Sequence, residues 1–164
     1  MATTQSNQSP HRLTRRQQDR LIEDAKAILT KRLSRKGALI KSPGDAATVG
    51  MFHLSQYEHE VFAILFLDSQ NRLLQFRELF RGTINGASVY PREIVKECLA
   101  ENAARVILMH NHPSGVAEPS FADQRITTRI EDALKLFDIE VLDHVIVAGT
   151  DFYSMKEFVK EARA

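Results

Sequence analysis

Residues 105–123 read RVILMHNHPSGVAEPSFAD, and the architecture of the chain can be built from them. The first part, up to His110, is apolar and rich in β-forming residues, and it predicts a buried strand. Pro113 cannot continue a regular strand, so a loop begins there. Ser120 follows a proline and opens a predicted helix that reaches about Phe137. A strand, a loop and a helix in this order are typical of an α/β protein.

The sequence on either side alternates between the patterns of strands and helices. Residues 60–67 are almost continuously apolar and predict a buried strand, which returns after a turn as a strand over 72–83. We expect the returning strand to bend near Arg77-Glu78. Further strands are predicted over 139–147 and from Tyr153, and further helices over 42–57, over 91–102 and after the last strand. The alternation predicts an α/β fold, a three-layer α/β/α sandwich around one mixed sheet.

The N-terminal quarter differs in charge from the rest of the chain. Residues 1–41 hold ten Lys and Arg against three Asp and Glu, a local charge of +7, whereas residues 42–164 hold twelve against eighteen, a local charge of −6. We expect a disordered leader over 1–11, a basic amphipathic helical arm over 12–41 and one domain over 42–164. The arm is interpreted as a solvated helix docked on the domain, with contact to nucleic acid or an acidic partner as the alternative.

Composition excludes several classes of protein. Apolar residues at 43% and charged residues at 26% are ordinary for a soluble globular protein. The apolar runs fall far short of the roughly 18 residues that a membrane-spanning helix needs, and the polar first ten residues do not resemble a secretory signal. We therefore expect a cytoplasmic protein without a membrane partner. The single cysteine, Cys98, excludes an internal disulfide and any site built from several thiolates, and we expect it in the core.

Two histidines and an acidic residue in the opening stretch indicate a metal site. Side chains at i and i+2 of a strand point to the same face, so His110 and His112 can present both imidazoles to one point. Asp123 lies in the first turn of the following helix and can face back to the strand end. Two histidines, one carboxylate and a fourth position left for water form an acceptable catalytic zinc set. Ser120 and Asp123 also fit a helix N-cap with an acidic residue at N3, so capping alone would explain that pair.

A zinc hydrolase also needs a general base that takes the proton from the attacking water. Glu60 is the best candidate, because it immediately precedes the most apolar strand, where a core element can hold it rigidly. A polar residue that merely flanks a strand is the structural alternative, and Glu58 is a competitor. His144 lies between apolar strand residues and is interpreted as a hydrogen-bonded core histidine rather than as a further ligand.

Together these residues resemble a known family. The order Glu60, His110-x-His112 and Ser120-x-x-Asp123 is similar to the JAMM (MPN-plus) metallopeptidase motif, and the wider sequence resembles the RadC family. Further matching stretches are Gly82-Thr83, Tyr90-Pro-Arg-Glu93, His110-Asn-His-Pro-Ser-Gly115 and Leu142-Asp-His-Val-Ile146. The resemblance extends over about residues 58–154. It implies a JAB/MPN fold, which is related in its layers to the cytidine deaminases.

The resemblance implies a zinc site with His110, His112 and Asp123 as ligands, Glu60 as general base and Ser120 as the residue that stabilises the oxyanion. It implies a zinc-dependent hydrolase of amide, peptide or isopeptide bonds, with a peptide or protein as substrate. A zinc nucleobase deaminase is excluded, because that chemistry uses a His/Cys-x-Glu and a Pro-Cys-x-x-Cys motif and this chain has one cysteine.

The N-terminal region departs from the long RadC proteins, which carry a helix-hairpin-helix DNA-binding domain. Residues 1–57 are too short for that domain, so in length the chain is more similar to the short RadC-like proteins of prophages and other mobile elements. The alternative function is a DNA-associated accessory protein, with a role in DNA repair or in a mobile element. In that case the fold is a binding scaffold, and the basic arm makes non-specific, salt-dependent DNA contacts.

Overall fold

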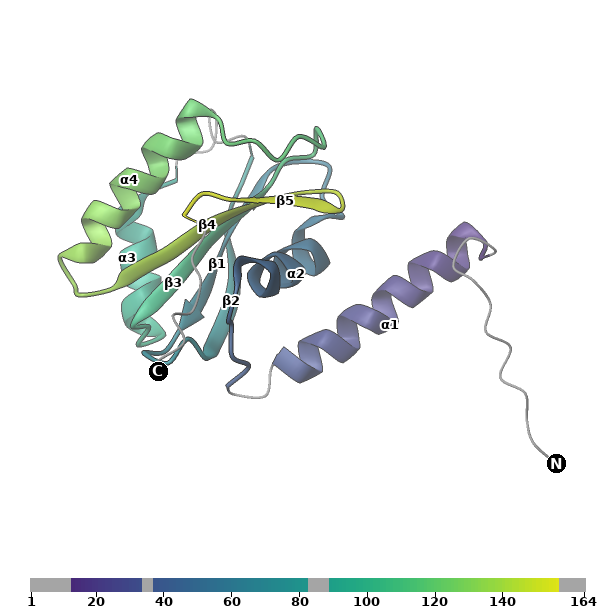
Figure 1. Ribbon diagram of the computed structural model, residues 1–164, viewed down its shortest axis with the longest axis horizontal. Helices are drawn as coiled ribbons and strands as arrows, with labels where there is room; N and C mark the ends of the chain where they lie inside the picture. The colour runs from purple at the N-terminus through teal and green to yellow at the C-terminus, as the bar shows by residue number, and fades with distance from the viewer. Residues whose placement is uncertain (1–12, 34–36, 83–88, 157–164) are drawn as a thin grey trace.

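A computed structural model describes residues 13–33, 37–82 and 89–156 (Figure 1). It contains a five-stranded sheet with the strand order β2-β1-β3-β4-β5. The strands are β1 (Val61–Leu67), β2 (Leu73–Arg81), β3 (Arg105–Asn111), β4 (Glu140–Ala148) and β5 (Asp151–Ser154). β3 and β4 run parallel and the other neighbouring pairs are antiparallel, so the sheet is mixed, as predicted.

Helices cover both faces of the sheet (Figure 1). The helices of the domain are α2 (Pro43–Leu54), α3 (Pro91–Ala100) and α4 (Phe121–Lys135). Because side chains alternate along a strand, Ala63 and Leu65 of β1 pack on the α2 side, whereas Ile64 and Phe66 pack on the side of α3 and α4. Every residue of β1 is buried. The predicted three-layer α/β/α sandwich is confirmed.

Local features of the domain follow the sequence patterns closely. Phe62 pairs with Phe80 and Ala63 pairs with Glu78, so Leu79 is an extra residue in β2, a β-bulge close to the predicted bend.

Cys98 is buried in the core, as predicted, and burial raises the pKa of its thiol to about 12. The predicted leader over 1–11 and the predicted helix after the last strand lie outside the described residues.

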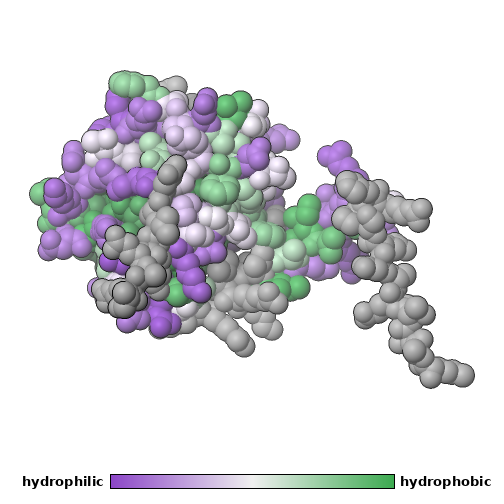
Figure 2. Space-filling view, viewed as in Figure 1, coloured by the Kyte–Doolittle hydropathy of each residue, from purple (hydrophilic) through white to green (hydrophobic). Residues whose placement is uncertain are grey.

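The basic arm forms α1 (Arg15–Leu33), which projects from the domain (Figure 1). Leu21, Ile22 and Ile28 are exposed at 54, 50 and 53%, and Figure 2 shows hydrophobic surface along this helix. The expectation that the apolar side docks on the domain is therefore wrong for these residues, because the charged residues between them keep the helix solvated. Contact of the arm with DNA stays a prediction. No helix within the described ranges is long and apolar enough to cross a membrane.

Asn111 joins the end of β3 to the start of β1. Its side chain is buried, and its Oδ1 accepts a hydrogen bond from the Val61 N–H at 2.7 Å. Its Nδ2 donates to the His59 carbonyl at 3.0 Å. Glu60 lies between His59 and Val61, so these two bonds hold the backbone on both sides of the candidate base. Asn111, which lies between His110 and His112, thus fixes the backbone that carries Glu60.

Replacement of Asn111 by alanine leaves the buried Val61 N–H and the His59 carbonyl without these partners. Because an unsatisfied buried polar group costs about 1–3 kcal/mol, we expect Asn111→Ala to lower the free energy of unfolding by about 2 kcal/mol. Urea denaturation followed by circular dichroism measures the change. Gln124→Ala, an exposed substitution on α4, is the control and should be nearly neutral. Equal stability of the two variants would contradict the role of Asn111.

Candidate metal centre

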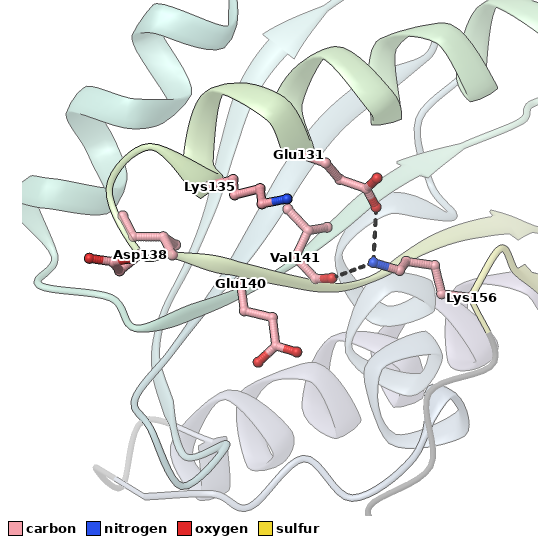
Figure 3. A pocket seen from close by; sticks show the side chains of 7 residues that line it. Glu131, Lys135, Asp138, Glu140, Val141 and Lys156 are labelled. Carbon is pink, nitrogen blue, oxygen red and sulfur yellow. Dashed lines mark hydrogen bonds and ion pairs between the residues drawn. The ribbon is translucent and has the colours of Figure 1, made fainter.

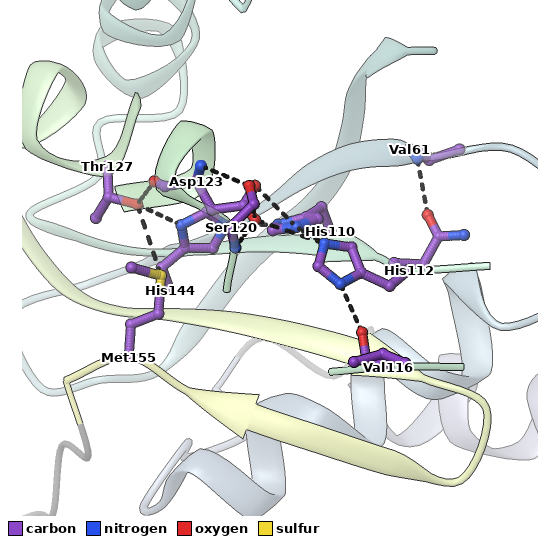
Figure 4. A network of polar contacts seen from close by, with 10 residues as sticks. Val61, His110, His112, Val116, Ser120, Asp123, Thr127, His144 and Met155 are labelled. Carbon is purple, nitrogen blue, oxygen red and sulfur yellow. Dashed lines mark hydrogen bonds and ion pairs between the residues drawn. The ribbon is translucent and has the colours of Figure 1, made fainter. Parts of the chain in front are cut away.

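Three side chains that can bind a metal meet where β3 ends and α4 begins (Figure 4). His110 lies in β3, His112 follows the strand, and Asp123 lies in the first turn of α4. The His112 N–H donates to the Val147 carbonyl at 2.8 Å, which continues the pairing with β4 beyond the end of β3. One ligand atom from each residue lies within 4.8 Å of the others. The structure thus brings together the three residues that the motif names as ligands.

The three groups share one small, buried space. His110 Nε2 lies 2.9 Å from His112 Nε2 and 3.2 Å from Asp123 Oδ1, and His112 Nε2 lies 3.6 Å from Asp123 Oδ2. His110 and Asp123 are buried, whereas 13% of the His112 side chain is exposed. Asp123 Oδ1 accepts no hydrogen bond within the part of the chain that the structure describes. A buried carboxylate oxygen without a hydrogen bond is unfavourable, so a cation bound beside it would stabilise the cluster.

Burial and the neighbouring charges shift the pKa values of the three residues in the cluster. The nearby Asp123 carboxylate raises the pKa of His112, and the negative charge of Glu60 adds to this shift. Burial would raise the pKa of Asp123, but His112, His110 and Ser120 hold it well below its usual range. Burial lowers the pKa of His110 well below its ordinary value. The Asp123 carboxylate thus favours positive charge on His112.

The donor atoms fit zinc. His112 Nδ1 lies 2.7 Å from the Val116 carbonyl, which can only accept a hydrogen bond, so Nδ1 carries the ring proton. In neutral His112 the Nε2 atom then offers its lone pair to a metal. Two imidazole nitrogens and one carboxylate oxygen are a ligand set of catalytic zinc, with a fourth position for water or substrate.

Ser120 is the N-cap of α4 and orients Asp123. Its N–H and its hydroxyl donate to Asp123 Oδ2 at 2.7 and 2.6 Å, and the Asp123 N–H donates to the Ser120 hydroxyl at 3.2 Å. These bonds form a capping box, so the structural interpretation of the pair holds in this geometry. They satisfy Oδ2 and leave Oδ1 for a metal. The contribution of Ser120 to an oxyanion stays a prediction.

Glu60 lies at the same end of the sheet as the ligands. The antiparallel register pairs Phe62 with His110, and the same register continued by two residues brings Glu60 beside His112. This position agrees with the effect of the Glu60 charge on the pKa of His112. Glu60 is half-buried, whereas Glu58 is exposed. The structure therefore favours Glu60 over Glu58 as the carboxylate beside the ligands.

Two buried residues behind the ligands have no counterpart in the sequence motif. His144 Nε2 lies 2.8 Å from His110 Nδ1, and Thr127 Oγ1 lies 2.6 Å from His144 Nδ1. The interpretation of His144 as a hydrogen-bonded core histidine is confirmed, and burial lowers its pKa to about 4. The spacing of Asp123 and Thr127, one helical turn apart, is a signal in the sequence that could have found Thr127. The contact of His144 with His110 becomes visible only through the parallel register, which pairs His144 with Leu108 on the face of the sheet that carries His110.

A separate pocket lies at the other end of α4 (Figure 3). It has a volume of about 390 Å³ and is lined by Glu131, Lys135, Asp138, Ile139, Glu140, Val141 and Lys156. Lys156 Nζ bonds to Glu131 Oε1 at 3.0 Å and to the Val141 carbonyl at 2.8 Å. Twelve residues of helix separate Asp123 from Lys135, a distance of about 18 Å, so this pocket does not belong to the metal cluster.

Comparison with known proteins identifies relatives over most of the chain. Residues 40–161 match the RadC-like JAB domain. Two relatives from Vibrio cholerae serotype O1, both named UPF0758 protein, are 55% identical over 128 residues and 51% identical over 136 residues. These matches cover 78 and 83% of this chain and 80 and 86% of the relatives.

Other relatives are longer. A UPF0758 protein of Marinobacter nauticus is 51% identical over 136 residues, which is 83% of this chain and 60% of that protein. The chain therefore spans less than two thirds of this relative. The match to the RadC-like JAB domain includes Glu60 and the three residues that meet at the candidate metal centre, His110, His112 and Asp123. The chain belongs to the RadC family, with a JAB domain that contains this cluster.

Proposed function

We propose that this chain is a zinc-dependent hydrolase that cleaves an amide bond in a peptide or an isopeptide. The observation that carries the proposal is the buried Asp123 Oδ1, which lacks a hydrogen bond among the described residues and lies beside His110 Nε2. The second imidazole, that of His112, lies 2.9 Å from the first. Membership of the RadC family supports the same proposal.

Each residue of the cluster has a defined task in this reaction. His110, His112 and Asp123 would hold the zinc, whose chemistry when bound is to polarise a carbonyl and to lower the pKa of water. Glu60 accepts the proton of the attacking water as general base and then donates it to the leaving amine as general acid. Ser120 keeps Asp123 ionised through two hydrogen bonds to its carboxylate. His112 is the least buried of the three residues, so substrate would approach from its side.

Loss of a ligand should remove the metal. We expect the unchanged protein to retain about one zinc ion per chain after dialysis, and His110→Ala or Asp123→Ala to retain almost none, because two protein ligands do not form a stable zinc site. Elemental analysis by mass spectrometry measures the content. His59→Ala, which removes an exposed histidine outside the cluster, is the control and should keep the metal. Equal zinc content in all four proteins would contradict the site.

Zinc affinity should depend on pH in a way that follows from His112. Asp123 raises the pKa of His112 in the metal-free protein, so zinc and a proton compete for this residue as the pH falls through that pKa. We therefore expect binding to weaken as the pH falls through the raised pKa and to lose this dependence above it. Chelator competition between about pH 6 and pH 8.5 measures the affinity, and calorimetry in two buffers counts about one released proton. Equal affinity across this range would contradict the assignment of His112.

Glu60 should be needed for cleavage but not for metal binding. Glu60→Gln removes the general base and keeps the size of the side chain, so we expect cleavage to fall at least about 100-fold while zinc stays bound. The probe is a pool of internally quenched random peptides together with a lysine isopeptide. Glu58→Gln, two residues away and exposed, is the matched control and should stay active. Absence of cleavage by the zinc-loaded unchanged protein, or equal cleavage by Glu60→Gln, would contradict the proposal.

A further inference from the structure

A chain of hydrogen bonds runs behind the ligands from the backbone of α4 to His110 (Figure 4). Thr127 Oγ1 lies 2.6 Å from the Asp123 carbonyl oxygen and 2.6 Å from His144 Nδ1. His144 Nε2 lies 2.8 Å from His110 Nδ1. Thr127, His144 and His110 are all buried, so these bonds do not compete with water. Neither Thr127 nor His144 belongs to the ligand set.

The direction of each hydrogen bond follows from the number of protons available. Thr127 Oγ1 donates its single hydroxyl proton to the Asp123 carbonyl oxygen, the i to i−4 bond that threonine commonly forms within a helix. Met155 Sδ, at 3.8 Å from the same hydroxyl, is a much weaker acceptor. With its proton used in this way, Thr127 Oγ1 must accept the bond from His144. The ring proton of His144 is therefore on Nδ1.

The same reasoning extends to His110. His144 is fully buried, and its ring nitrogens face a hydroxyl and an imidazole rather than a carboxylate, so the neutral ring is favoured. A neutral imidazole with its proton on Nδ1 has a lone pair on Nε2. His144 Nε2 then accepts a hydrogen bond from His110 Nδ1. This leaves His110 Nε2 without a proton, facing Asp123 Oδ1 at 3.2 Å.

We propose that Thr127 and His144 are positioning residues that select the Nδ1–H form of His110, so that its Nε2 atom is available to zinc. This proposal rests on the proposed metal site, and it explains how His110 is held in the form that can bind zinc. His112 reaches the same form through a backbone carbonyl, that of Val116. His110 lies in a strand paired on both sides, by β1 and β4, whose backbone carbonyls form the sheet. His144, on the neighbouring strand β4, therefore supplies the hydrogen-bond acceptor for His110 Nδ1 in place of a backbone carbonyl.

Thr127→Val tests this device because it keeps the branched shape and removes the hydroxyl. Without that acceptor, His144 is free to move its proton to Nε2 and to donate to His110 Nδ1, which forces the proton of His110 onto the metal-binding nitrogen. We expect zinc affinity, measured by chelator competition at about pH 8, to fall about 10- to 100-fold. Nitrogen-15 NMR of the histidine rings in the metal-free protein should show the proton of His110 on Nδ1 in the unchanged chain and on Nε2 in the variant.

Thr128→Val is the matched control. Thr128 lies next to Thr127 on α4, and its Oγ1 donates to the Gln124 carbonyl at 3.1 Å in the same i to i−4 pattern, but it is exposed. This variant should bind zinc as the unchanged chain does. Thr127→Ser, which restores a hydroxyl, should recover most of the affinity. A merely structural role of Thr127 would lower stability without moving the proton of His110.

Several outcomes would overturn the inference. Unchanged zinc affinity in Thr127→Val, or a proton on Nε2 of His110 in the metal-free unchanged chain, contradicts it directly. If the unchanged chain binds no zinc, the proposed function fails, whereas the NMR spectrum still decides whether Thr127 and His144 set the form of His110. If Thr127→Val does not fold, the same spectrum is recorded for the unchanged chain and for Thr127→Ser. These two spectra then show which ring nitrogen of His110 carries the proton.

Discussion

The Nε2 atoms of His110 and His112 lie 2.9 Å apart next to a buried carboxylate oxygen, so a hydrogen or a cation must lie between the two nitrogens. If neither nitrogen carried a proton, the two lone pairs would repel each other at this distance, and the carboxylate adds a full negative charge. A proton relieves part of the repulsion, but one hydrogen cannot bridge all three groups in good geometry. A metal cation can bind two nitrogens and one oxygen together. The domain thus holds an arrangement whose electrostatics a metal satisfies better than a proton does.

The fold holds these atoms in place by drawing each from an element with little freedom. β3 is the central strand of the sheet, and its residues from Val106 to Asn111 are buried. α4 brings Asp123 to the strand end, and the capping box fixes the carboxylate relative to the first turn of that helix. Asn111 secures the segment that carries Glu60. The candidate ligands, the candidate base and the residues that support them therefore lie at one end of the sheet and at the N-terminus of one helix, where the capping box holds Asp123.

The sequence predicts the part of this site that depends on local geometry. His110 and His112 share a face because of the period of a strand, and Asp123 returns to the strand end because it lies in the first turn of a helix. Thr127 and His144 are different, since their contact joins a helix to a strand whose parallel register no local pattern specifies. The prediction that α1 docks on the domain is wrong for Leu21, Ile22 and Ile28 for a related reason. The spacing of its apolar residues predicts a helix. It does not predict whether these apolar side chains pack against the domain or stay exposed to solvent.

The two interpretations of Ser120, helix cap and oxyanion contact, are compatible because of how a hydroxyl works. As a cap, the oxygen accepts from the Asp123 N–H at 3.2 Å, and this bond uses a lone pair rather than the proton. The proton itself is directed at Asp123 Oδ2, at 2.6 Å. Rotation about the Cβ–Oγ bond would move that proton without moving the oxygen, so capping would persist while the proton turned to a substrate. Asp123 Oδ2 would then keep the Ser120 N–H at 2.7 Å, so the carboxylate would not be left without a hydrogen bond.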